Sequence, residues 1–179
     1  MTADNNHLIT SLGRFVITWS ILDLTLDAAI KNHLGVDIHR SAIVTTGLGF
    51  ERKVSILRAL LQLNDPKYAE AIALLGTITT TARRNVMLHG HVWVGDDQLE
   101  FVKMDTDKKL SARMVAFKPK EFHELIKSLA VMIDKLQGLV GVTEEDKHAI
   151  ANIGKSLATN KPKSGKPQTE LAPVFCTGR

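Results

Sequence analysis

Three residues within the segment 82–93 have side chains suited to cleaving a phosphodiester: Arg84, Asn85 and His89. A guanidinium donates paired hydrogen bonds to phosphate oxygens and keeps its charge at any working pH. An imidazole can accept or donate a proton near neutrality, and an amide can position either the ribose or the imidazole. Cleavage of RNA by its own 2′-hydroxyl needs a base, an acid and stabilisation of charge at phosphorus. We therefore predict an RNA-cleaving site that uses no metal and no organic cofactor.

One copy of this site supplies a single imidazole of the required kind, whereas the reaction uses both an acid and a base. A two-fold dimer brings a second copy of the same residue to the site. The expected partners are therefore a second copy of the chain and an RNA substrate.

The three residues lie near the end of a helix predicted over residues 66–88, with Pro66 at its first position. On such a helix Asn85 and His89 are four residues apart and share one face, with Arg84 on the adjoining strip. Gly90 is a predicted C-cap, so the imidazole should project from the last turn at an accessible edge.

These residues resemble the Arg-x4-6-His motif of HEPN domains, in which the residue after the arginine is commonly polar. Two flanking segments agree with the resemblance. Trp19-Ser-Ile-Leu-Asp23 is similar to the Trp-x-x-Leu-Glu pattern of bacterial HEPN-like proteins, with Asp23 in place of the more usual glutamate. His89-Gly-His-Val-Trp93 is similar to their His-Gly-x-x-Trp ending. The resemblance covers roughly residues 8–139.

The resemblance implies a metal-independent endoribonuclease in which two motifs pair to form one composite site, and in which Arg84, Asn85 and His89 are catalytic. Asp23, Arg83 and His91 are the residues expected to support them. Many members of the family are toxins of toxin–antitoxin or abortive-infection systems, so an antitoxin or another protein partner is implied as well. The alternative is a non-catalytic helical module that dimerises and binds a protein or a nucleotide.

Apolar residues at alternating steps of three and four predict long helices around this site. The expected helices are residues 8–35, a short stretch at 39–46, 51–64, 66–88, 119–139 and a short final helix at 143–157. Alternating apolar residues predict a β-hairpin or three-strand meander at about residues 91–117, with a turn at Gly95-Asp96-Asp97. The expected fold is all-α, an antiparallel helical bundle of HEPN-like form with this β insertion before the fourth long helix. Its domain covers residues 1–157, followed by a disordered basic tail at 158–179.

The first helix carries a wider apolar stripe than one neighbour can cover. Ile9, Val16, Ile17, Ile21 and Ile30 extend it, so this helix should be contacted on two sides and be central to the core.

Charge and composition exclude several classes of protein. The 179 residues carry a net charge of +4 and one cysteine, Cys176, which excludes a disulfide scaffold and a thiolate metal centre. Five basic residues against one acid after residue 154 account for the whole excess, which leaves 18 basic and 18 acidic residues before it. The sequence offers no run of about 18 apolar residues and no signal-peptide pattern. We expect a cytoplasmic protein with no membrane association and no global attraction to nucleic acid.

Other interpretations of the same residues remain open. Basic groups at a helix C-terminus also favour the helix dipole, which alone could explain Arg83 and Arg84. His89 and His91 could ligate a metal, although no third ligand is evident nearby. Trp19 and Trp93 are expected to be core or interface aromatics rather than base-stacking platforms.

Overall fold

The computed structural model describes residues 3–63, 66–81, 84–95, 98–105 and 110–159, and for residues 3–5, 84–85, 105 and 154–159 it describes the backbone alone. The helices are α1 (Ala3–Leu34), α2 (Ile38–Thr45), α3 (Phe50–Leu63), α4 (Ala69–Thr81), α5 (Arg84–Met87), α6 (Pro119–Val140) and α7 (Glu144–Thr159). The strands are β1 (His91–Val94), β2 (Leu99–Asp105) and β3 (Ser111–Phe117). The described chain is thus mostly helical with a small sheet before α6, which confirms the coarse fold prediction.

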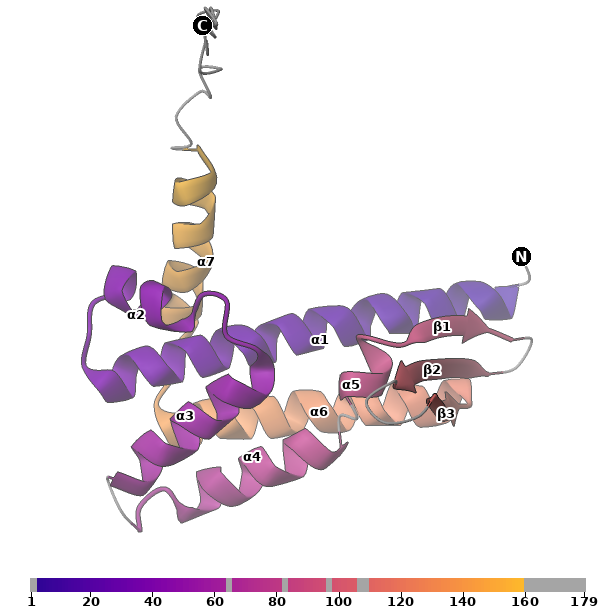
Figure 1. Ribbon diagram of the computed structural model, residues 1–179, viewed down its shortest axis with the longest axis horizontal. Coiled ribbons are helices and arrows are strands. Elements are labelled where there is room, and N and C mark those ends of the chain that lie inside the picture. Colours follow the sequence, from indigo (N-terminus) through magenta and orange to yellow (C-terminus); the bar gives the residue numbers. More distant parts are fainter. Residues whose placement is uncertain (1–2, 64–65, 82–83, 96–97, 106–109, 160–179) are drawn as a thin grey trace, which may run out of the picture.

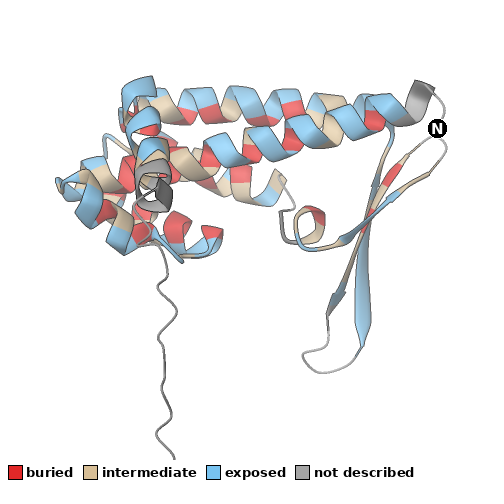
Figure 2. Cartoon of the chain, turned by 90° about the horizontal axis from the view of Figure 1, so that it is seen from above, coloured by how far each residue is buried: buried red, intermediate tan, exposed pale blue. Residues whose placement is uncertain are grey.

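Helix α1 is the centre of the structure, with α6 alongside it, α2, α3 and α7 towards its C-terminal end, and the strands near its N-terminal end (Figure 1). Its buried residues repeat every three or four positions, at Leu8, Phe15, Trp19, Leu22, Leu26, Ala29 and Ile30. Figure 2 shows the buried positions concentrated where the helices face one another. Gly35, with a φ of 63°, ends the helix in the left-handed conformation, as the sequence predicted.

The predicted second contact face of α1 is only partly covered. Ile30 is fully buried, whereas Ile9, Val16, Ile17 and Ile21 are exposed, with Ile17 at 62%. By length and composition, Asn6–Leu34 is also long and apolar enough to cross a membrane, a test that the core helix of a soluble protein passes as well. The N-terminal half of α1 therefore presents an apolar strip that no other described element covers.

The strands form an antiparallel sheet in the order β1-β2-β3. One face carries Leu99 and Phe101, both fully buried, and packs on Phe122 of α6. The rings of Phe101 and Phe117 lie 5.9 and 5.5 Å from that of Phe122, which lies 5.8 Å from the ring of Phe15 in α1. Phe122 thus joins the sheet to the helices, and it helps to position the sheet, including β1, against them.

The continuous helix predicted over residues 66–88 is wrong, because α4 begins at Ala69 and ends at Thr81. Pro66 lies in the preceding turn, where its carbonyl accepts from the Ala69 amide. Thr77, Thr79 and Thr80 donate their side-chain hydroxyls to carbonyls four residues earlier, a pattern that weakens or bends helices. This threonine run directly precedes the end of α4.

Helix α7 is tied to the end of α1 by one carboxylate. Asp146 accepts from Lys31 at 3.0 Å and from the Thr143 amide and hydroxyl at 3.0 and 2.8 Å. Burial opposes the charge on Asp146, but these hydrogen bonds outweigh it and hold the pKa of the carboxyl well below its ordinary value of 3.8. The helix continues to Thr159, and the predicted tail from residue 160 lies outside the described residues.

We expect Asp146→Asn to lower the free energy of unfolding by about 1–3 kcal/mol at pH 7, since it removes a charge that accepts hydrogen bonds from Lys31, from Asn32 and from the Thr143 amide and hydroxyl. A carboxyl with a depressed folded-state pKa stabilises the fold above its unfolded pKa and loses that contribution as pH falls. The difference between variant and wild type should therefore shrink below about pH 4. Urea unfolding at several pH values measures this, with Glu145→Gln, an exposed neighbour, as control. Equal losses for the two variants would contradict the assignment.

Candidate functional site

The segment predicted to be catalytic lies at the junction of the helices with the sheet. Arg84 and Asn85 are the first two residues of α5, and their side chains are outside what the structure describes, as is all of Arg83. Met87, at the end of α5, is buried and anchors this short helix in the core. His89 follows in a turn and is exposed, and it makes at least one interaction with the rest of the chain.

Asn85 lies in a helix, as predicted, but His89 does not. Helix α5 ends at Met87, so the predicted sharing of one helical face is corrected to a short helix followed by a turn. The backbone still keeps Arg84, Asn85 and His89 within six consecutive residues. Because Met87 is held in the core, this segment cannot move freely away from the helices.

Gly90 fixes the direction of the turn, for a reason other than the predicted one. It is not among the glycines with a positive φ, so it does not act as a left-handed C-cap. Instead, a Cβ at this position would lie against the backbone carbonyl of Val86 and 2.9 Å from the carbonyl oxygen of Val102 in β2. Only a residue without a side chain lets the chain pass between α5 and β2.

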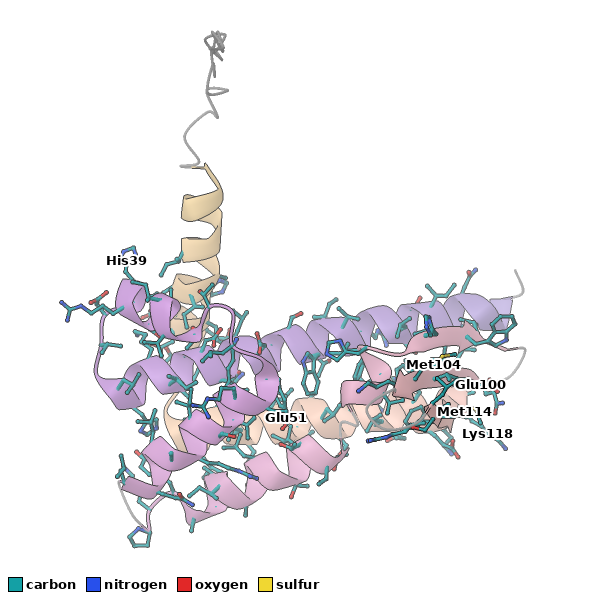
Figure 3. The ribbon with its side chains drawn as sticks, viewed as in Figure 1. His39, Glu51, Glu100, Met104, Met114 and Lys118 are labelled. Atoms are coloured by element: carbon teal, nitrogen blue, oxygen red, sulfur yellow. The ribbon has the colours of Figure 1, made fainter. Side chains whose placement is uncertain are left out.

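Strand β1 carries two of the predicted residues on the sheet face that is turned away from the helices. His91 pairs with Val102 and Trp93 pairs with Glu100 in β2, and both His91 and Trp93 are exposed. Met104 and Met114 belong to the same face, 61% and 65% exposed, and project from the sheet with Glu100 in Figure 3. Trp93 is 69% exposed, so it is not a core residue. β1 is an edge strand, and no described element covers its outer face.

Asp23, expected to support the arginine, forms an ion pair with α3. Its carboxylate lies 2.9 Å from Lys53 Nζ, which also lies 2.9 Å from Asp27 Oδ1. The Lys53 side chain is only 6% exposed. Burial raises the pKa of the Asp27 carboxyl, and the contact with Lys53 offsets this only in part.

Sequence reasoning missed this triad, because neither Lys53 nor Asp27 was singled out as a site residue. A signal was present. Asp23 and Asp27 are four residues apart inside a strongly apolar helix, and a charge in that setting needs a partner. A lysine on the next long helix supplies it.

In the part of the chain that the structure describes, no three His, Cys, Asp or Glu side chains are grouped so that they could bind a metal ion. Cys176 lies outside the described residues. Comparison of the chain with models of protein families, with curated proteins and with solved structures gave no match.

Gly90→Ala should destabilise the fold by about 1–3 kcal/mol, because its methyl group would overlap two backbone carbonyls that cannot rotate away. Gly138→Ala is the matched control: it lies in α6 with nothing within 4 Å of the added carbon, and alanine favours helix. We expect that variant to be neutral or more stable by up to about 1 kcal/mol. Thermal or urea unfolding compares the two. Equal stabilities would show that the turn is not sterically determined.

Proposed function

We propose that the protein is a metal-independent endoribonuclease of HEPN type that acts as a homodimer. The observation that carries the proposal is the exposed His89, held by the buried Met87 and by Gly90 within five residues of Arg84. In this proposal His89 supplies the proton-transferring group and Arg84 the phosphate-binding group, from one short segment of the chain. The finer description of the fold as an antiparallel HEPN-like bundle belongs to the same proposal.

Each residue has a defined task in the proposed reaction. One His89 imidazole takes the proton of the ribose 2′-hydroxyl as its oxygen attacks phosphorus, and the 5′-oxygen leaves with a proton from the imidazole of the second copy. The products are a 2′,3′-cyclic phosphate and a 5′-hydroxyl. Arg84 stabilises the charge on the phosphoryl oxygens, and Asn85 orients the ribose or the imidazole. Arg83, His91 and Asp23 are the supporting groups of the proposed reaction.

The uncovered strip on α1 supports self-association. Ile9, Val16, Ile17 and Ile21 are exposed apolar residues in the half of the helix that lies near the strands. Interfaces between identical subunits are more apolar than the remaining surface. A second copy of the chain would cover this strip and would bring a second motif towards the first.

In the cell, an enzyme of this kind acts on cytoplasmic RNA as a toxin or a phage-defence effector, with an antitoxin or another protein as a further partner. The folded part has balanced charge, so RNA recognition relies on contacts at the site rather than on a global field.

Purified protein at micromolar concentration should cleave a mixed RNA pool with EDTA present, and Arg84→Ala and His89→Ala should each lower the rate about 100-fold or more. The controls are Arg40→Ala and His148→Ala, exposed residues on α2 and α7. Gel analysis of product ends should show 2′,3′-cyclic phosphates. No cleavage by the wild type, or full activity of either variant, would reject the proposal.

Dimerisation is tested separately. Ile17→Asp should raise the Kd of the dimer by about tenfold or more, because it buries an unpaired carboxylate in the interface. Leu63→Asp, at an 81% exposed position at the end of α3, should leave the Kd unchanged. Sedimentation over a concentration series measures both. A monomeric wild type, or a dimer indifferent to Ile17→Asp, would remove the composite site on this face.

The alternative function is a non-catalytic module that binds a protein or a nucleotide. The exposed sheet face favours it, since Trp93, Met104 and Met114 are residue types enriched in protein interfaces. RNA binding without cleavage, or a stable complex that masks His89, would support this alternative.

A further inference from the structure

A cavity of about 330 Å³ lies between α1, α2 and α7. Its walls are mainly apolar, from Ile38 and Ala42 of α2 and from Ile150 and Ile153 of α7. The polar lining includes Asp27 of α1 with Ser41 and Thr45 of α2. Concave sites with apolar walls and a few convergent polar groups are typical of small-molecule binding.

The polar end of the cavity holds an uneven set of charges. Lys53 lies between the carboxylates of Asp23 and Asp27, so two acids share one ammonium. The Asp27 side chain is 14% exposed, and burial of the excess negative charge is unfavourable. A second cation at Asp27 would neutralise the group. An anionic ligand would be repelled.

The polar end of the cavity has a hydrogen-bond acceptor that is not used by the described residues. Asp27 Oδ1 is shielded from solvent and, among the described residues, receives no hydrogen bond of good geometry, although the Lys53 ammonium is near. Ser41 is 2% exposed and lines the same cavity, so its hydroxyl lies close to the polar end. Buried polar groups are normally satisfied, so a carboxylate oxygen without a hydrogen bond at a cavity wall indicates a missing partner.

The apolar end continues into a second hollow of about 470 Å³ on the same side of α2. The two cavities share Ala42, Thr46 and Ile153, and the second adds His39 and Ile43. Figure 3 shows His39 on the outer side of α2, away from the sheet. A ligand with its polar group at Asp27 can therefore extend an apolar body between α2 and α7.

We propose that this cavity binds a small amphipathic primary amine in its ammonium form. An ammonium has three N–H donors, and the cavity offers three acceptors: the Asp27 carboxylate and the hydroxyls of Ser41 and Thr45. The hydrocarbon part packs on Ile38, Ile150 and Ile153. The cavity lies at the opposite end of α1 from the strands, so this binding is independent of RNA cleavage.

Hexylammonium chloride is the probe, titrated into the full-length protein at pH 7 by calorimetry, with 1-hexanol and hexanoate as neutral and anionic controls. Hexylammonium should bind saturably with one site per chain. The alcohol should bind about tenfold more weakly or worse, because it lacks the charge that Asp27 pairs, and hexanoate should not bind. Equal binding of amine and alcohol would overturn the proposal, as would preferential binding of hexanoate.

Variants separate recognition from folding. Asp27→Asn should weaken hexylammonium binding about tenfold or more, and Ser41→Ala should weaken it several-fold. Asp134→Asn, an exposed acid on α6, is the matched control and should bind as the wild type does. Undiminished binding by Asp27→Asn would reject the site.

If Asp27→Asn does not fold, Ala42→Leu tests the same cavity by filling it. This substitution lies on one wall of both hollows and should abolish binding while a helical circular dichroism spectrum is retained. Full binding by folded Ala42→Leu would place the amine elsewhere and overturn the proposal. Arg84→Ala should bind hexylammonium normally, which distinguishes failure here from failure of the ribonuclease proposal.

Discussion

The structure depends on the burial of one long face of α1. This helix contacts α2, α3, α6 and α7, and its residues from Leu8 to Ile30 form the middle of the core. Burial of a large apolar side chain stabilises a fold by about 1.5–3 kcal/mol, so this face outweighs any single polar contact. The sheet depends on the same face indirectly, because its inner residues reach α1 through Phe122 and Phe15.

Charged groups within that face determine how α3 lies along α1. The Lys53 ammonium contacts both Asp23 and Asp27, which are one helical turn apart, and only one register of the two helices allows both contacts. Apolar residues of similar size could match the stability of such a triad, but not its directionality. The same register sets the Asp27 carboxylate at the wall of the cavity beside α2.

The sequence was sufficient for features that rest on local patterns. It predicted the end of the first helix at Gly35 and the helix starts near Phe50 and Pro119. The alternation of apolar residues located the segment that forms the sheet. The sequence was insufficient for the features that tertiary packing determines. Gly90 is required because β2 approaches it closely at Val102, a contact that no local pattern predicts. Trp93 is exposed because no described element covers the outer face of β1. The sequence located the candidate site in the chain but did not predict its geometry, since α5 ends at Met87 and the helical spacing assumed for Asn85 and His89 stops there.

The end of α5 at Met87 determines where the predicted catalytic histidine lies. His89 lies in a turn between a short helix and an edge strand. That turn is held from two sides, by Met87 in the core and by Gly90 against β2, so its position is determined although its surface is open. Catalytic groups must keep their geometry without ordering costs at each turnover. An anchored turn at an open surface satisfies that requirement.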